Sequence, residues 1–471
     1  MVRRLSVSCC RATGAVMAIR SLQALPPKMQ PTLRAARMKG GDGLRASCEG
    51  SAMSDLAPSA RPSLRSRLAV LRRPGFALLF AATSVSTLGS AVASIVLTFA
   101  LLAKGYSASA VGVVVAAQTA PMVVLLLAGG VAGDRWPRRS IMVGADLLRF
   151  ASQGVLAILL LRGHPSLAAL MTLAGLCGVG NAFYGPAESG LVPQAAGPEH
   201  IKAANSLISL TSSLIGVIGP SLGGLLVMLG GAALAIGLDA ASYALSAGLL
   251  SLMPTLGHGQ PAAARASFVA DLRQGWGEFS RHRWLRLITV QFGLLNLLTF
   301  PSFIVLGAAS FAPVPGGLQM WGLVISASGA GGVAGGLLLL RWTPPRPLVI
   351  VELAVVLAAL PVALLALRAP VAVIAVGGAM LGMAGATLNV LILTAIQDSV
   401  PDAVLSRVNS LVILVAQGLA PIGFAACGPA AQLVGVRRAL GGGALILLVS
   451  AVVMLGVQDI RRYRSPHRQA T

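Results

Sequence analysis

Charged residues are scarce in this chain. Only 11% of its 471 residues are Asp, Glu, Lys or Arg, and only 14 are acidic. Ordinary soluble domains carry about 25% charged residues. The mean hydropathy of +0.82 points in the same direction. The composition therefore argues against a soluble protein.

The chain also lacks two short motifs of common enzymes. It contains no HExxH or GxxxxGK[ST] stretch, and the missing phosphate-binding loop argues against an ATP-driven pump. Its five histidines fall in expected loops or tails, and its five cysteines show neither metal-ligand nor disulfide spacing. We therefore expect no enzymatic activity, no cofactor and no metal site.

Long apolar runs dominate the sequence instead. Each is long enough to cross a hydrocarbon core of ~30 Å, whereas barrel strands would be shorter and would alternate in polarity. We predict an all-α polytopic membrane protein with twelve transmembrane helices in two six-helix pseudo-repeats. The predicted spans are 75–103, 108–133, 139–161, 165–188, 203–228, 231–253, 284–309, 317–340, 346–367, 370–394, 405–434 and 438–457.

A polar segment divides these runs into six and six. Residues 1–70 mix Arg, Ser, Pro and Gly, which is typical of a disordered tail; a later translation start at Met53 is an alternative for the first 52 residues. The expected parts are a basic cytoplasmic tail at 1–70, a six-helix bundle at 71–253, a cytoplasmic central loop at 254–283, a second bundle at 284–458 and a cytoplasmic tail at 459–471.

The net charge of +22 does not indicate a nucleic-acid partner. Residues 1–74 hold fourteen Lys and Arg against three acidic residues, which is half of the excess, and the rest lies mainly in alternate short loops. This distribution follows the positive-inside rule and places both termini in the cytoplasm of a cell inner (plasma) membrane protein. No basic surface with interleaved aromatic residues is evident, so we expect no nucleic-acid binding.

The two halves repeat at a nearly constant offset of 204 to 208 residues. Parallel six-span repeats, related by an axis along the membrane normal, are typical of secondary transporters. The matched positions include Gly130 and Gly336, Arg135 and Arg341, Asp146 and Glu352, Val192 and Val400, and Asn205 and Asn409.

The loop after the second span reads G-x-x-x-D-R-x-x-R-R, and this pattern resembles the signature loop of the major facilitator superfamily, with Pro137 where that family usually has Gly. "GPSLGG" on the fifth span is similar to the end of the superfamily's antiporter motif, although Gly216 is one position out of register. "GADLLRF" and "QDSVPDAVLSRVNS" resemble the branch that includes the enterobactin exporter. The resemblance covers about residues 70–460 and implies two halves that rock about a central cavity.

Two sets of residues acquire expected roles from this resemblance. The loop would act as a conformational gate that docks near the eleventh span, and its alternative role is a topology anchor. The glycines would form an antiporter-like hinge, or only a close-packed helix crossing. The gate residues are Gly130, Asp134, Arg135, Arg138, Arg139, Asp146 and Arg149; the hinge residues are Gly219, Pro220, Gly223 and Gly224.

Carboxylates inside a membrane are costly, so each is a candidate functional group. The candidates for ion coupling are Asp239, Glu188 and Glu352. Asp239 is the deepest of them, and a helix-packing role is equally open for it. Asp146 and Glu352 are repeat-mates near the cytoplasmic edge, and we expect both to pair with arginines of the loops, with Arg149 as the alternative partner of Asp146.

Uncharged polar residues on the first, fourth, seventh and tenth spans would line the cavity in this fold. Each could equally make an interhelical hydrogen bond. Together they predict a mostly apolar pocket that suits amphiphilic or neutral compounds. These residues are Ser90, Asn181, Tyr184, Gln291, Asn296, Asn389 and Thr394.

The sequence thus predicts a monomeric secondary transporter embedded in the lipid bilayer. We expect it to export a small hydrophobic or amphiphilic molecule, with the proton as coupling ion by resemblance to the family. An importer of a neutral metabolite is the alternative within the class. A non-transporting membrane scaffold or sensor, which uses the basic tail for lipid or protein contacts, is the alternative outside it.

Overall fold

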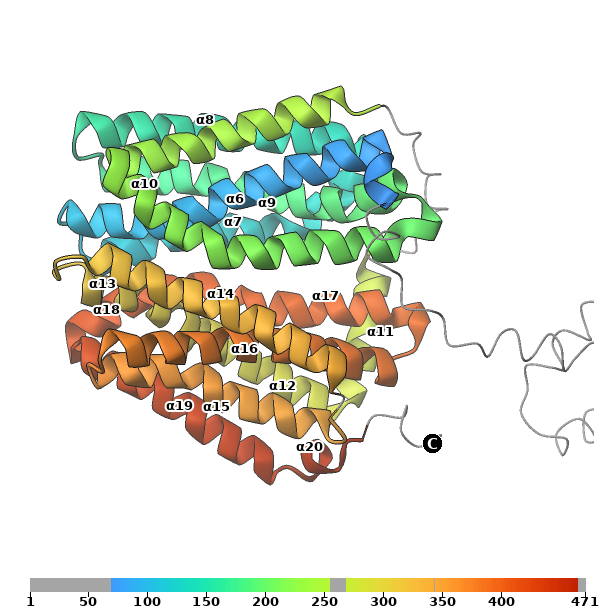
Figure 1. Cartoon of the computed structure of the whole chain (residues 1–471). Helices are drawn as coiled ribbons and strands as arrows, with labels where there is room; N and C mark the ends of the chain where they lie inside the picture. Colours follow the sequence, from blue (N-terminus) through green and yellow to red (C-terminus); the bar gives the residue numbers. More distant parts are fainter. Residues whose placement is uncertain (1–68, 255–267, 343, 465–471) are drawn as a thin grey trace, which may run out of the picture. The chain divides into compact units, whose positions relative to one another are not determined.

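The computed structural model describes residues 69–254, 268–342 and 344–464 (Figure 1). The expected tail at 1–70 falls outside these ranges except for its last two residues, and the expected tail at 459–471 falls outside them from residue 465 onward. The described residues form helices and no strand. The first half comprises η2 (Ala69–Arg72), α6 (Pro74–Ala103), α7 (Ala108–Arg135), α8 (Arg138–Arg162), α9 (Leu167–Ala196), η3 (Pro198–His200) and α10 (Ile201–Leu252).

The second half comprises more and shorter elements, because its seventh and eleventh spans are interrupted. They are α11 (Phe268–Arg281), α12 (Arg283–Leu294), η4 (Leu295–Thr299), η5 (Ser302–Leu306), α13 (Gly307–Phe311), α14 (Gly317–Arg341), α15 (Pro347–Ala366), α16 (Val371–Ser399), α17 (Asp402–Gly418), α18 (Ala420–Val434), α19 (Val436–Gly456) and α20 (Gln458–Arg462).

Helix boundaries follow local chemistry. The side chain of Ser107 accepts a hydrogen bond from the backbone N–H of Ala110 at the start of α7, and Ser166 does the same for Ala169 in α9. Such caps satisfy backbone donors that have no partner inside the helix. The fifth and sixth spans merge into α10, which is interrupted only at Gly231 with φ 76° and ψ 176°. Glycine adopts this positive φ without strain.

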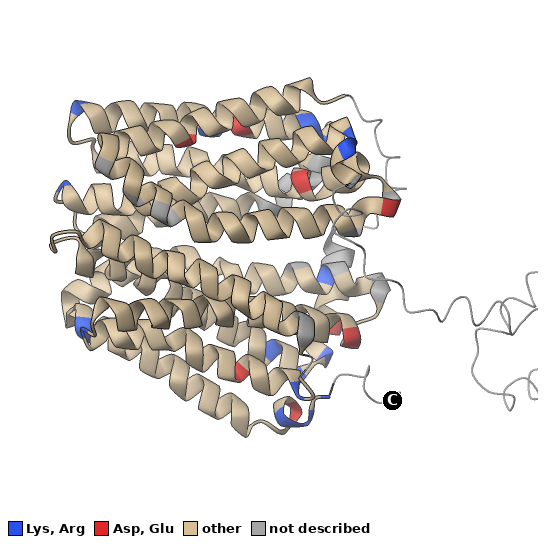
Figure 2. Cartoon of the chain, viewed as in Figure 1, with Lys and Arg blue, Asp and Glu red and all other residues tan. Residues whose placement is uncertain are grey.

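The polytopic helical architecture is confirmed. Within the described ranges, eleven helical stretches are long and apolar enough to cross a membrane, and a shorter apolar helix covers Ala203–Gly219. The number twelve stays a prediction. Figure 2 shows that Lys and Arg gather toward the helix ends and that most of the helical length carries no charge.

Three local features differ from the expected spans. The segment expected as a central loop contains the amphipathic helix α11, while residues 255–267 lie outside the described ranges. The seventh span contains two π-helical turns, η4 and η5, on either side of Pro301. The eleventh span breaks at Leu419, just before Pro421. Proline lacks the backbone N–H that an uninterrupted helix requires, which accounts for breaks of this kind.

The predicted repeat is visible in the helix pairs. In the first half α7 packs on α9 and α8 packs on both α9 and α10; in the second, α14 packs on α16 and α15 packs on both α16 and α19. Each helix pair in the second half corresponds to a helix pair in the first half at the repeat offset. The largest contacts between the halves are those of α7 with α18 and of α10 with α14. At the repeat offset, each of these two helix pairs corresponds to the other.

Both crossings between the halves depend on glycine. A Cβ on Gly112 of α7 would lie 2.3 Å from the carbonyl oxygen of Phe424, and one on Gly329 of α14 would lie 2.4 Å from that of Gly216. Only glycine permits backbones to approach this closely. Close glycine contacts thus hold the two halves together at two repeat-related helix pairs.

Candidate functional site

Asp146 is the centre of a polar cluster inside the first half. It lies on α8 with 0% of its surface exposed. Its Oδ1 accepts a hydrogen bond from Nη2 of Arg149, and the two side chains form an ion pair. Because they are three residues apart on one helix, they share a face. The Oδ2 atom accepts a 2.7 Å bond from the hydroxyl of Ser246 on α10.

The guanidinium of Arg149 lies between two aromatic rings. Its Cζ atom is 4.1 Å from the ring centre of Tyr184 on α9 and 4.5 Å from that of Tyr243 on α10. Its Nη1 atom donates a 3.2 Å hydrogen bond to Oδ1 of Asn181. Aromatic faces attract a cation, and most strongly when water is excluded. Arg149 is 5% exposed, so its charge is balanced by these neighbours and Asp146 rather than by water.

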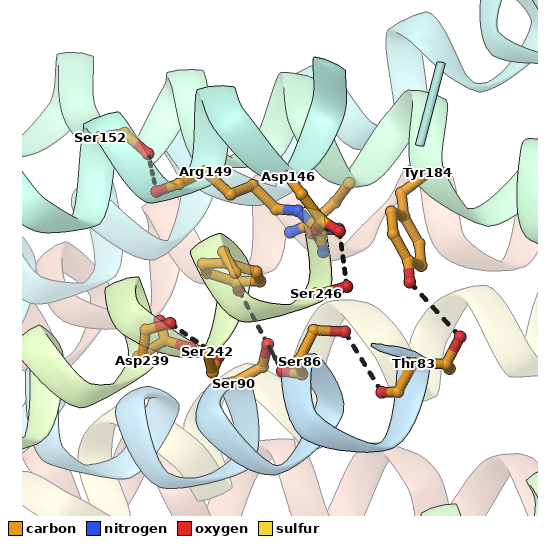
Figure 3. Close-up of polar contacts among 12 residues, drawn as sticks. Thr83, Ser86, Ser90, Asp146, Arg149, Ser152, Tyr184, Asp239, Ser242 and Ser246 are labelled. Carbon is orange, nitrogen blue, oxygen red and sulfur yellow. Dashed lines mark hydrogen bonds and ion pairs between the residues drawn. The ribbon is translucent and has the colours of Figure 1, made fainter. Parts of the chain in front are cut away.

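Hydroxyl groups extend the cluster to α6, as Figure 3 shows. The hydroxyl of Tyr243 hydrogen-bonds that of Ser90 at 2.8 Å, and that of Tyr184 contacts that of Thr83 at 3.4 Å. Ser90 also donates to the backbone carbonyl of Ser86. The cluster therefore joins α6, α8, α9 and α10 through side-chain contacts.

Asp239 lies at the margin of this cluster without a partner of its own. It is 1% exposed, and neither carboxylate oxygen accepts a hydrogen bond from the protein. Ser242 donates to the backbone carbonyl of Asp239 and not to its carboxylate (Figure 3). On the other side, a Cβ on Gly89 of α6 would lie 2.7 Å from Oδ1. Arg149 is the charged group that acts on Asp239.

The second half holds a smaller cluster at the repeat-related place. Glu352 on α15 is 0% exposed, and its Oε2 accepts a 2.8 Å hydrogen bond from the amide of Gln291 on α12. The same amide donates to the hydroxyl of Ser450 on α19, at 3.2 Å. The expected arginine partner from a loop was wrong here, because Glu352 is enclosed by helices and paired with an amide.

The other candidate polar residues have different surroundings. Glu188 is half-buried on α9, with Thr83 and Arg149 as polar neighbours. Asn296 donates to the backbone carbonyl of Phe292. Asn389 and Thr394 on α16 are exposed, whereas Gln291 is buried against Glu352. Among the described residues, no group of His, Cys, Asp and Glu could hold a metal ion.

Two gate arginines tie the start of α8 to neighbouring helices of the same half. Arg138 donates to the backbone carbonyl of Gly190 on α9, and Arg139 donates to that of Ser251 on α10. Hydrogen bonds from an ionised donor are stronger than those between neutral groups. α7 also contacts α17, and the docking of the gate near the eleventh span stays a prediction. The side-chain surroundings of Gly130, Asp134 and Arg135 lie outside what the structure describes.

The hinge glycines pack against α6. A Cβ on Gly219 would lie 2.6 Å from Cβ of Ala91, and one on Gly223 would lie 3.1 Å from the carbonyl oxygen of Val92. This geometry is that of a close-packed crossing. The surroundings of Pro220 and Gly224 are not among the described ones.

Sequence reasoning missed several residues of the two clusters. Ser246 and Ser450 are separated by 204 residues, the offset already found for Asn205 and Asn409. A systematic search at this offset would have found both. Tyr243 gave no such signal, because the residue 204 positions later is Leu447.

Comparisons with known proteins agree on one class. The bacterial homolog of the human lysosomal transporter Spinster has 15% identity and a TM-score of 0.61, over 86% of this chain and 100% of that one. The nucleoside transporter NupG has 16% identity and a TM-score of 0.64, over 83% and 99%. The peptide transporter POT in complex with sulfate has 14% identity and a TM-score of 0.66, over 83% and 96%.

At this low identity the likeness shows the fold alone, and no curated protein matches the sequence. The fold and a family match over most of the chain together identify a membrane transporter of the major facilitator superfamily. The family model MFS_3, described as transmembrane secretion effector, matches residues 65–466, and the chain belongs to this family. The likeness to the enterobactin exporter's branch remains a resemblance.

Proposed function

We propose that this transporter exports small hydrophobic or amphiphilic compounds from the cell in exchange for protons. Alternating access would move the substrate through the membrane, with both termini in the cytoplasm. Two facts support export and orientation: the family description names secretion, and the basic residues follow the positive-inside pattern.

The surroundings of Asp239 carry the coupling part of the proposal. A carboxylate that is 1% exposed and accepts no hydrogen bond from the protein is very costly as an anion. Binding of a proton removes this cost. Arg149, the cation nearby, is already paired with Asp146. Loss of the proton from Asp239 would therefore compete for Arg149 and disturb the contacts that join α8 to α9 and α10.

The polar clusters also support the substrate class. A strongly anionic substrate needs an available buried cation, and Arg149 is held by a carboxylate, an amide and two rings. The exposed candidates on α16, Asn389 and Thr394, are uncharged. Such surroundings favour neutral or amphiphilic molecules.

Dye transport into everted membrane vesicles that contain the full chain in their membrane tests the proposal. Acidification of the lumen should drive uptake of a fluorescent amphiphilic dye, because protons leave as the dye enters. Asp239→Asn should abolish this pH-driven uptake while the amount of folded protein is unchanged. The matched control is Asp459→Asn, because Asp459 is an exposed acid on α20.

Each other outcome has a definite meaning. Dye uptake by Asp239→Asn that still follows the pH gradient would remove Asp239 from coupling. Dye that leaves the lumen instead of entering it would favour import. Equal dye movement in vesicles with and without the chain, repeated across a panel of neutral and amphiphilic probes, would favour the scaffold alternative.

A further inference from the structure

The cluster in the second half has too few hydrogen-bond donors for its acceptors. The amide nitrogen of Gln291 donates to Oε2 of Glu352 and to the hydroxyl of Ser450. Ser450 uses its own proton on the backbone carbonyl of Leu447, at 2.8 Å. Two buried oxygens accept nothing from the protein: Oε1 of Glu352 and Oε1 of Gln291.

The charge is uncompensated as well. Within the described ranges, no ion pair includes Glu352, and Gln291 is the only polar group that acts on it. An isolated buried carboxylate without a cation costs so much that such groups become neutral instead. The first half avoids this by placing Arg149 three residues after Asp146, whereas Val355 follows Glu352 at the same spacing.

We propose that Glu352 and Gln291, supported by Ser450, form a proton-binding site in the second half, and that it is occupied in the conformation described here. A proton from water binds Oε1 of Glu352, and the resulting O–H donates to Oε1 of Gln291. The amide and the acid then face each other through two parallel hydrogen bonds. One added proton thus removes the charge and satisfies both unpartnered oxygens.

The number of available ligands selects a proton over a metal ion. Ca²⁺ and Mg²⁺ require about six or more oxygen ligands, and this cluster offers two acceptors without donors. The amide donor of Gln291 also points at the carboxylate, where it would repel a metal cation. A single proton between two oxygens matches this set.

A release step can be assigned to the helix that carries Gln291. The π-helical turn η4 begins at Leu295, four residues after Gln291, and α12 ends at Leu294. π-helical turns frequently occur at functional sites in otherwise regular helices. A change of register here would withdraw Gln291 from Glu352 and favour loss of the proton. This role in coupling rests on the proposed function, whereas the bound proton does not.

Infrared difference spectroscopy of the purified full chain in lipid nanodiscs tests the site directly. The wild type should show the carbonyl band of a protonated carboxylic acid from Glu352. Glu352→Gln should lose this component and keep its fold, because the new amide donates to Gln291 where the acid O–H did. Gln291→Leu should shift the band, and the exposed-acid control Asp459→Asn should retain it.

The outcomes separate this site from the proposed function. If Glu352→Gln leaves the carboxylic-acid band unchanged, the proposed proton-binding site is wrong. This conclusion does not depend on how Asp239→Asn changes the infrared band of Asp239. If the band is lost, the same vesicle assay tests coupling: Glu352→Gln should flatten the pH dependence of dye transport. A normal pH dependence would overturn the coupling role and leave the proton-binding site in place.

Discussion

The two halves of this transporter place a carboxylate at the same point of the repeat and stabilise it in opposite ways. Asp146 pairs with Arg149, and two tyrosine rings flank the cation. Glu352 has an amide neighbour instead. Both carboxylates are fully buried, and both lie near a serine on the last span of their half, Ser246 or Ser450.

The surrounding residues explain the difference. Val355 and Leu447 occupy the positions that correspond to Arg149 and Tyr243, so the second half lacks both the cation and one of the rings beside it. The first half therefore keeps a fixed charge pair, and the second holds a group that is neutral when protonated. On the proposal above, the carboxylate without a neighbouring cation binds and releases a proton, whereas the ion-paired carboxylate keeps its charge.

The largest effect should follow loss of the acid in the first half. Asp146→Asn removes the ion-pair partner of the buried Arg149, and removal of one partner from a buried pair costs about 3–5 kcal/mol. Thermal unfolding of the purified protein in detergent should show a correspondingly large loss of stability. The glutamate in the second half should not show such a loss when it is changed to glutamine.

The paired variant makes the comparison sharper. Asp146→Asn combined with Arg149→Gln removes the stranded charge, so it should recover part of the lost stability. If the double variant is no more stable than Asp146→Asn alone, the stranded charge is not the cause. If Asp146→Asn is as stable as the wild type, the charge pair does not stabilise the first half.

The sequence could predict one carboxylate's surroundings better than the other's. Spacing along a single helix places Arg149 one turn after Asp146, so their contact can be anticipated from periodicity alone. The pairing of Glu352 with Gln291 depends on how α12 and α15 are rotated against each other. A single sequence carries no signal for that rotation. The prediction gave Glu352 a loop arginine because buried carboxylates often pair with arginine, and this partner was wrong.

The architecture was easier to predict than its interruptions. Hydropathy and the repeat offset determine the spans and the paired halves, because both depend on composition over many residues. The π-helical turns around Pro301 and the helix α11 depend on local packing. Asp239 was singled out by depth alone, and its lack of any donor required the structure.

A smaller effect should follow loss of the amide in the second half. Gln291→Leu keeps the volume but removes the donor to Glu352, and an unsatisfied buried polar group costs about 1–3 kcal/mol. Thermal unfolding should show a loss below that of Asp146→Asn. The double variant Gln291→Leu with Glu352→Leu removes both partners and should recover most of it. A loss that matches Asp146→Asn would mean that Glu352 carries a charge.

The smallest effect should come from one hydroxyl beside Arg149. Tyr243→Phe removes the 2.8 Å hydrogen bond to Ser90 but keeps the ring over the guanidinium. A typical hydrogen bond contributes about 0.5–1.5 kcal/mol, and Ser90 retains its bond to the carbonyl of Ser86. Tyr243→Leu, which copies the second half, should cost more because it also removes the cation–π contact. Equal unfolding temperatures for the two variants would show that the ring does not stabilise Arg149, and the contrast between the halves would then rest on the carboxylate pair alone.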